Sequence, residues 1–208
     1  MIRGKQFIIG IDEVGRGPLA GPVVVGGVAV SVNSKSKKIK NPQQIKNPKI
    51  LKDIRDSKKL SAGKREEWNR ILRKNFECHY VSVNNKTIDR IGIQKAVAFG
   101  VRKLLNEFSI KPDMVLLDGS LKAPKHYNQK TIVGGDEKIP VISAASVIAK
   151  VARDRKMMNL PKKFSKYAFE KHKGYGTGLH YEMLKKYGVS KLHRKTFLKN
   201  LQKRSSSV

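Results

Sequence analysis

Two adjacent acids at the end of an apolar segment are the residues of this chain best suited to chemistry. Residues 8–24 read Ile-Ile-Gly-Ile-Asp-Glu-Val-Gly-Arg-Gly-Pro-Leu-Ala-Gly-Pro-Val-Val, so the apolar run leads into Asp12 and Glu13 and then into a glycine-rich loop. Carboxylates beside buried backbone are costly unless they are paired, hydrogen-bonded or bound to a metal. The loop glycines allow close approach to the backbone, and Arg16 adds a fixed cation. This segment therefore indicates a site for metal and phosphate.

Two further acids stand close to the ends of predicted strands. Asp118 closes the apolar segment Met-Val-Leu-Leu-Asp, and Asp136 lies between a predicted strand and a predicted helix. Oxygen ligands suit Mg²⁺ or Mn²⁺ rather than zinc, and two such ions about 3.5–4 Å apart can support phosphodiester hydrolysis. Taken alone, each acid has an ordinary alternative as an ion-pair partner. Four acids so placed, in a chain with only 16, favour a metal site.

The composition indicates a polyanionic partner. A formal charge of +29 over 208 residues favours nucleic acid first and an anionic membrane second, although a lysine excess can also reflect genome composition or solubility. Cys78 is the only cysteine, which excludes an internal disulfide and fits a small apolar strand residue in a reducing compartment. No segment has the roughly 18 apolar residues of a membrane span. We expect a cytoplasmic protein that does not bind membranes.

The pattern of apolar residues predicts a mixed sheet with helices around it. A hairpin of strands is followed by strands that alternate with helices, and Ser61 is placed to cap the first helix. Residues 33–56 are rich in Lys, Asn, Gln and Pro, which predicts a flexible basic insertion. The predicted strands are 6–12, 22–32, 78–83, 114–118 and 130–133, and the predicted helices are 62–76, 91–108, 143–158 and 178–187.

The loop after Glu13 also matches a dinucleotide-binding pattern. Residues 15–20, Gly-Arg-Gly-Pro-Leu-Ala, fit G-x-G-x-x-G/A after a strand. A dinucleotide site needs a helix next, but the following segment is rich in valine and predicts a strand. It also needs an acid about 20 residues on, whereas the next acid is Asp53. These features disfavour a dinucleotide-binding fold.

Seven blocks in order, spanning about residues 7 to 198, resemble the ribonuclease HII family. The blocks are Gly10-Ile-Asp-Glu-Val-Gly-Arg-Gly-Pro-Leu-Ala-Gly-Pro22, Asp56-Ser-Lys-Lys-Leu-Ser61, Leu117-Asp-Gly119, Gly135-Asp136, Ile142-Ser-Ala-Ala-Ser-Val-Ile-Ala-Lys-Val-Ala-Arg-Asp-Arg155, His172-Lys-Gly-Tyr-Gly-Thr177 and His193-Arg194. The resemblance implies an α/β, RNase H-like fold with a five-stranded mixed sheet and a C-terminal helical extension. It also implies a catalytic domain over 1–160 and an extension with a basic tail over 161–208.

The resemblance implies an endonuclease that cleaves the RNA strand of RNA–DNA hybrids. It further implies cleavage 5′ of single ribonucleotides embedded in duplex DNA, leaving 3′-hydroxyl and 5′-phosphate ends. In the family, four carboxylates hold two divalent ions, Mn²⁺ or Mg²⁺. The positions that match here are Asp12, Glu13, Asp118 and Asp136.

The resemblance also assigns substrate contacts. The backbone of Gly15, Arg16 and Gly17 is expected to read the ribose 2′-hydroxyl, the group that distinguishes RNA from DNA. Tyr175 is expected to stack on the sugar of the next nucleotide. Ser57 and Lys58 are either phosphate contacts or part of an ordinary loop before a helix, and the sequence leaves the two interpretations even.

Other residues receive supporting roles. Asp154 lies within a helix beside Arg153 and Arg155, which favours a structural ion pair. The spacing of His172, His180 and His193 fits no zinc pattern and favours a supporting or DNA-contacting role. The family's usual Asn-Ala-Thr is replaced by Lys95-Ala96-Val97, which puts substrate preference in question.

Two alternatives of different kinds stay open. One is a non-catalytic, basic nucleic-acid-binding protein on the same fold, which would have no reason to keep four acids in a cationic groove. The other is a nuclease of the ribonuclease HI type, which lacks the Gly-Arg-Gly and Gly-Tyr-Gly-Thr blocks. We expect a monomer, and no clamp binding through the segment from Gln202, which lacks an aromatic pair.

Overall fold

A five-stranded mixed sheet forms the centre of the protein. The computed structural model describes residues 4–34, 48–54, 60–160 and 162–198. The strand order is β3-β2-β1-β4-β5, with β1, β2 and β3 antiparallel and with β4 and β5 parallel to β1. The strands are β1 (Gly4–Val14), β2 (Val23–Ser34), β3 (Glu77–Val83), β4 (Met114–Asp118) and β5 (Gln129–Ile132). The predicted mixed sheet is confirmed.

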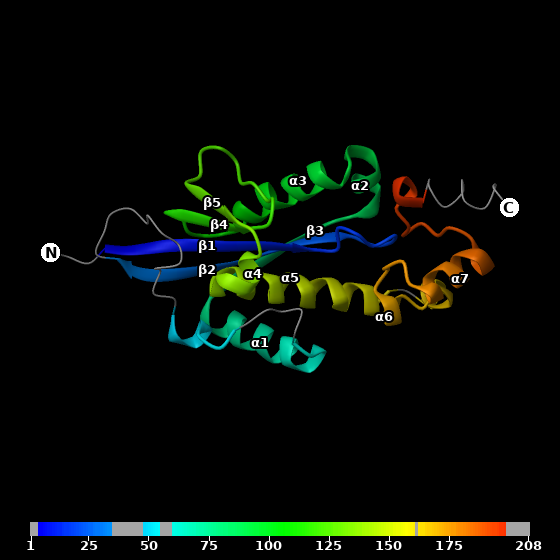
Figure 1. The fold of residues 1–208 in the computed structure, drawn as a ribbon, viewed down its shortest axis with the longest axis horizontal. Helices are drawn as coiled ribbons and strands as arrows, with labels where there is room; N and C mark the ends of the chain where they lie inside the picture. The colour runs from blue at the N-terminus through cyan, green and yellow to red at the C-terminus, as the bar shows by residue number, and fades with distance from the viewer. Residues whose placement is uncertain (1–3, 35–47, 55–59, 161, 199–208) are drawn as a thin grey trace.

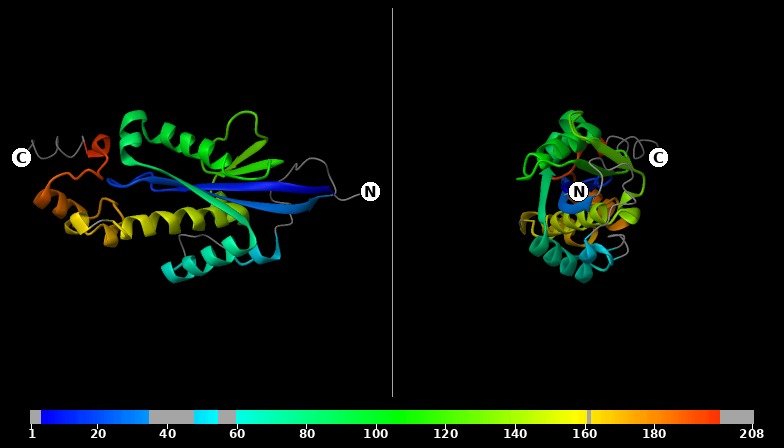
Figure 2. Two further views of the ribbon diagram at one scale, coloured as in Figure 1. Left: turned by 180° about the vertical axis from the view of Figure 1, so that it is seen from behind. Right: turned by 90° about the vertical axis from the view of Figure 1, so that its left-hand side faces the viewer.

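Helices cover both faces of this sheet (Figures 1 and 2). One face packs on α1 and α5 and the other on α3. In the described residues, no helix is both long and apolar enough to cross a bilayer. The helices are η2 (Lys49–Leu51), α1 (Ala62–Asn75), α2 (Asn85–Ile91), α3 (Ile93–Leu105), α4 (Gly135–Lys138), α5 (Pro140–Met158), η3 (Lys162–Tyr167), α6 (Phe169–His172) and α7 (Gly178–Tyr187).

Two glycines let α5 lie directly on the central strands. A Cβ on Gly10 would stand 2.4 Å from the carbonyl oxygen of Val141, and one on Gly26 would stand 2.6 Å from that of Ala145. Any larger residue at either position would push the helix away. The close contact buries most of α5 and fixes its distance from the end of β1.

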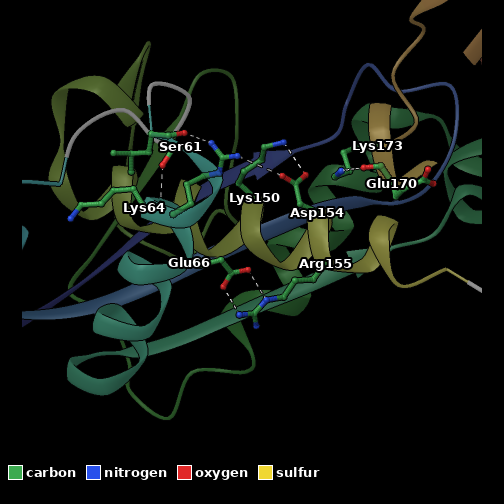
Figure 3. Close-up of polar contacts among 10 residues, drawn as sticks. Ser61, Lys64, Glu66, Lys150, Asp154, Arg155, Glu170 and Lys173 are labelled. Atoms are coloured by element: carbon green, nitrogen blue, oxygen red, sulfur yellow. Dashed lines mark hydrogen bonds and ion pairs between the residues drawn. The ribbon is translucent and has the colours of Figure 1, made fainter. Parts of the chain in front are cut away.

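Ion pairs fix α1 against α5 on the outer side of this layer (Figure 3). Asp154 accepts from Lys150 Nζ at 2.9 Å and lies 3.9 Å from Arg65 Nη2, while Arg155 Nε donates to Glu66 at 2.8 Å. The predicted structural ion pair of Asp154 is thus confirmed, although its partners are Lys150 and Arg65 rather than the adjacent arginines.

Three sequence predictions about elements are corrected. The helix predicted over 91–108 is α3, which is shorter at both ends, and α2, which Asn84 caps and which ends at Gly92 with φ +80°, was not predicted. Helix α5 begins at Pro140, three residues early, since proline suits a first helical position. Residues 33–56 are not wholly a flexible insertion: β2 extends to Ser34, and Leu51 and Ile54 are buried in the core.

The C-terminal segment attaches to the loop after β1 through the backbone. Ala20 and His193 form an isolated antiparallel bridge, and the Arg194 amide donates to the Leu19 carbonyl at 2.8 Å. The Leu19 amide in turn donates to the Gly174 carbonyl at 2.8 Å. In Figure 1, α7 lies beyond the end of the sheet toward which β1 runs. The extension therefore contacts the end of β1 that carries the acids.

Buried histidines connect the parts of this extension. The Ser190 amide donates to Nδ1 of His193 at 2.9 Å, so the proton of His193 resides on Nε2. That Nε2 lies 3.0 Å from Nε2 of His180, whose Nδ1 is 2.9 Å from the Tyr175 carbonyl oxygen. Both histidines are therefore neutral and have fixed tautomers. The chain of hydrogen bonds ends on the backbone of Tyr175.

His172 completes the cluster. Its Nδ1 accepts from the Gly174 amide at 3.1 Å, and its Nε2 donates to the Tyr167 carbonyl at 2.8 Å. Its ring stacks on His180 with centroids 4.3 Å apart. All three histidines are buried, which confirms a supporting role and leaves none of them exposed for contact with DNA.

Acid should destabilise this cluster. Burial, together with His180, lowers the pKa of His193 from 6.5 to about 4. Between these values the unfolded chain binds the extra proton, so stability is present above pH 6.5 and is lost as pH falls toward 4. We expect the free energy of unfolding, measured by urea titration, to fall by up to about 3 kcal/mol over this interval from His193 alone.

The variant His193→Gln should flatten this pH dependence while lowering stability at neutral pH. His126→Gln, at an exposed histidine, is the matched control and should leave the slope unchanged. An unaltered slope in His193→Gln would assign the acid sensitivity to other groups.

Candidate active site

The pairing of β1 with β4 brings the predicted carboxylates into one region. The two strands are parallel and Ile11 pairs with Leu117, so Asp12 and Asp118 follow at the same end of adjacent strands. Next to them, Asp118 pairs with Ile132 of β5, and the chain then turns at Gly134 into α4. The helix α4 contains Asp136, so this residue lies in a four-residue helix rather than in a loop.

Asp12 is a buried acid among other acids. Its side chain is 4% exposed, and Oδ1 accepts from the Glu13 amide at 2.7 Å. Burial, together with the charges of Glu13 and Asp118, raises the pKa of Asp12 to about 8, against a hydrogen bond from Ser146 that lowers it. Too little positive charge therefore lies near Asp12 to stabilise its ionised form.

Glu13 has one oxygen bound and one without a partner. Its Oε1 accepts from Arg16 Nη1 at 3.1 Å, whereas its Oε2 is buried and has no hydrogen bond within the described ranges. Burial raises the pKa of Glu13 even though Arg16 lowers it. A cation at Oε2 would supply the missing partner.

Asp118 and Asp136 are joined through the start of α4. Asp118 Oδ1 accepts from the Gly135 amide at 2.6 Å, which places the next residue, Asp136, beside the end of β4. Asp136 is 2% exposed, and the hydroxyl of Ser143 donates to its carbonyl oxygen. The first turn of α5 thereby fixes α4 against the end of the sheet.

These four carboxylates fit a divalent cation in chemistry, but they are not a preformed cage. Among the residues that the structure describes, no three or more His, Cys, Asp or Glu side chains are arranged to hold a metal. The donor set is nevertheless all oxygen, and it includes an acid with a strongly raised pKa and the unpartnered Oε2 of Glu13. A bound Mg²⁺ or Mn²⁺ would stabilise the ionised form of the acid and would give the Glu13 oxygen a partner.

The Gly-Arg-Gly loop lies directly after these acids and is supported by two buried arginines. Gly15 has φ +90°, and a Cβ there would stand 2.2 Å from Arg153 Nε, whereas Gly17 is exposed with open space around it. Both Arg153 and Arg194 are 0% exposed. Within the described part of the chain neither forms an ion pair with a carboxylate; both donate to backbone carbonyls instead.

The electrostatics of the two arginines follow from this burial. Burial lowers the pKa of Arg153, and burial together with the Arg153 charge lowers that of Arg194 to about 9. Both remain charged at neutral pH. They place two positive charges under the loop that follows Asp12 and Glu13.

Tyr175 lies at the edge of the same region. Its ring is 39% exposed and lies over the guanidinium of Arg153, 5.4 Å from the ring centroid. The preceding Gly174 approaches Ala20 so closely that a Cβ would stand 2.4 Å from the Ala20 carbonyl oxygen. The exposure of the Tyr175 side chain disfavours a role for it in the core. Ser57, Lys58 and the tail from Gln202 lie outside the described residues.

A cavity beside the loop contains polar residues that the sequence did not single out. It has a volume of about 370 Å³ and is lined by Arg16, Gln94, Val97, Ala98, Ser120, Leu121 and Lys122. Val97 belongs to the segment that departs from the family pattern, whereas Lys95 is exposed. The only feature of the sequence that could have pointed to Ser120 and Lys122 is their proximity to Asp118 along the chain.

Comparisons with known proteins agree with this geometry. The family model for ribonuclease HII matches residues 9–200. Ribonuclease HII of Caldicellulosiruptor bescii is 40% identical over 199 residues, which cover 95% of this chain and 89% of the relative. That of Endomicrobium trichonymphae is 42% identical over 197 residues, covering 94% and 87%.

A solved structure shares the fold over the whole chain. Ribonuclease H2 from Pyrococcus horikoshii has a TM-score of 0.71 at 28% identity and covers 98% of this chain and 100% of its own. The match to the family model, the two relatives and the shared fold lead to one conclusion. The chain belongs to the ribonuclease HII family, and it is a hydrolase of the ribonuclease H type.

Proposed function

We propose that this protein cleaves the RNA strand of RNA–DNA hybrids and cuts 5′ of single ribonucleotides embedded in duplex DNA. The products carry 3′-hydroxyl and 5′-phosphate ends, and the enzyme acts in ribonucleotide removal during DNA replication and repair. Two divalent ions, Mg²⁺ or Mn²⁺, are held by Asp12, Glu13, Asp118 and Asp136.

One observation carries this proposal. Asp12 is buried next to Glu13 and Asp118 with its pKa raised to about 8, shortly before a glycine loop in which Gly17 is exposed. A protein that only binds nucleic acid gains nothing from anionic groups facing a polyanion. Carboxylates that need cations, beside a loop suited to reading a sugar, support a metal-dependent nuclease.

Different residues of the chain have different roles in the proposed reaction. When bound, the ions supply an activated water and charge for the leaving oxygen. The backbone of Gly15, Arg16 and Gly17 contacts the ribose 2′-hydroxyl, while Arg16 also orients Glu13 through their 3.1 Å hydrogen bond. Tyr175 presents an exposed ring to the neighbouring sugar.

A duplex with one ribonucleotide tests the proposal directly. The protein should cut it with Mg²⁺ or Mn²⁺ and should leave it intact with a chelator, and the matched all-DNA duplex should stay uncut. A protein that binds the ribonucleotide duplex and cuts neither substrate with any divalent ion would be the non-catalytic binder.

The variant Asp118→Asn should lose cleavage by at least about 100-fold while duplex affinity stays close to that of the wild type. Loss of a carboxylate weakens charge stabilisation of the transition state, but the basic surface still binds phosphate. Single-turnover cleavage and fluorescence anisotropy give the two quantities.

Asp113→Asn is the matched control for this variant. Asp113 precedes the other end of β4, where its Oδ2 accepts from the Phe7 amide at 2.8 Å. It should retain cleavage. Full turnover by Asp118→Asn would remove Asp118 from the metal site.

Salt should weaken substrate binding steeply. Lysine and arginine contacts to phosphates release counterions, so we expect KM to rise by about tenfold or more between roughly 50 and 200 mM salt. The value of kcat should change little, because it is measured on the bound complex. A flat KM would mean that the charge of +29 is compositional.

The variant Tyr175→Ala should reduce cleavage at a single embedded ribonucleotide more than cleavage of a long hybrid. An aromatic face on a sugar or base contributes about 1–3 kcal/mol, which is about one to two decades in rate if it acts in the transition state. The melting temperature should hardly change, since the ring is exposed.

Tyr80→Ala is the control for Tyr175→Ala. Tyr80 is also an exposed tyrosine beside an arginine, with Arg73 at 5.9 Å, but it lies on the edge strand β3. It should leave the substrate preference unchanged. Equal losses on both substrates with a lowered melting temperature would instead make Tyr175 a structural residue.

A further inference from the structure

We infer that Arg194, in the C-terminal extension, is a positioning residue that sets ribose recognition by aiming the backbone N–H groups of the Gly-Arg-Gly loop. The inference rests on the proposed function, because it concerns how that loop reads a 2′-hydroxyl. The first observation is that the buried guanidinium of Arg194 is hydrogen-bonded to backbone carbonyls.

Arg194 donates all its observed hydrogen bonds to backbone carbonyls of one loop. Nη2 donates to the Gly15 oxygen at 2.6 Å, Nη1 to the Arg16 oxygen at 2.8 Å and Nε to the Gly21 oxygen at 3.0 Å. The guanidinium is planar and its donors diverge in fixed directions, so one side chain fixes two consecutive peptide groups. The guanidinium lies on the inner side of the loop, since it is 0% exposed.

The geometry of the peptide bond converts these contacts into a prediction about donors. In a trans peptide the C=O of one residue and the N–H of the next point in opposite directions. No peptide bond in the described ranges is cis. With the Gly15 and Arg16 carbonyls turned inward to Arg194, the amides of Arg16 and Gly17 must point outward.

Those two amides are free to bind a ligand. Neither donates a hydrogen bond to another group in the part of the chain that the structure describes. Gly17 is exposed, and a Cβ placed on it would meet no atom within 4 Å. Two adjacent outward N–H groups form a pair of donors suited to a hydroxyl oxygen, and the cation behind the carbonyls polarises both peptides.

The backbone around Arg194 holds it in register with the loop. Its own amide donates to Leu19, and the Gly21 amide donates to Leu192 at 2.9 Å. Asp89 fixes the next residues by accepting from the Lys195 amide at 2.9 Å and the Thr196 amide at 3.0 Å. The loop's conformation therefore depends on a segment about 180 residues away in the chain.

The variant Arg194→Lys tests the inference because it keeps the charge and loses the planar fork. The first readout is affinity, in chelator, for a duplex with one ribonucleotide relative to the matched all-DNA duplex. We expect the wild type to bind the ribonucleotide duplex more tightly than the all-DNA duplex. In Arg194→Lys this ratio of affinities should fall by about tenfold, because two hydrogen-bond donors to one hydroxyl are weakened. The second readout is the cleavage ratio between ribose and 2′-fluoro substrates, which should move toward one.

Tyr167→Phe is the matched control. It removes the hydrogen bonds of the Tyr167 hydroxyl to the Tyr187 and Gly188 carbonyls, which lie in the same C-terminal segment and away from the Gly-Arg-Gly loop. It should lower the melting temperature and leave both ratios unchanged. A general structural role of Arg194 would lower activity on all substrates alike and leave the ratios as in the wild type, which would overturn the inference.

The wild-type protein provides a measurement that requires no folded variant. The ¹⁵N resonances of the Arg16 and Gly17 amides and of the Arg194 guanidinium should shift together when the ribonucleotide duplex is added. They should not do so with the all-DNA duplex. Shifts of the two amides without Arg194, or no ribose-dependent shift in a wild type that cleaves at ribonucleotides, would overturn the role of Arg194. A wild type that neither prefers nor cuts the ribonucleotide duplex would overturn the proposed function itself.

Discussion

The parallel pairing of β1 with β4 is the constraint on which the site depends. It brings the ends of two buried strands side by side and thereby places the buried Asp12 next to the partly buried Asp118. Burial, together with the charges of Glu13 and Asp118, raises the pKa of Asp12. The fold therefore concentrates carboxylates where a bound cation would favour their ionised forms. The close packing of α5 on Gly10 and Gly26 keeps this end of the sheet rigid.

Two kinds of charge meet at this end of the molecule without neutralising each other. The carboxylates follow the strands, whereas the buried guanidiniums of Arg153 and Arg194 lie under the next loop and bind carbonyls. A direct ion pair between the two sets would satisfy both and leave nothing for a ligand. Because the arginines are held by backbone instead, the acids stay available for cations and the loop amides for a ligand.

Much of this arrangement could be predicted from the sequence, for identifiable physical reasons. Apolar runs that end in acids predict buried strands, and the structure has such strands leading to Asp12 and Asp118. Helix α2 was missed because its seven residues are too few to show a helical period. The burial of Leu51 and Ile54 was missed because apolar residues scattered through a basic segment give no periodic signal.

The contacts of Arg194 were beyond sequence reasoning for a different reason. Its block is short, and its partners are carbonyl oxygens, which every residue has. No pattern of side chains can therefore mark them. The two segments meet only in the tertiary structure, through the bridge between Ala20 and His193 and the backbone bonds beside it.

This separation has a consequence for how the protein can vary. Under the proposed function, cleavage depends on carboxylates fixed by the sheet, while the choice of sugar depends on a loop fixed by the C-terminal extension. Substitutions in the sheet core change the distance between Asp12 and Asp118 and so act on every substrate. Substitutions around Arg194, His193 or Tyr175 act on the loop and its neighbouring ring, and leave the strand ends in place. Substrate preference and chemical competence can thus change independently in this fold.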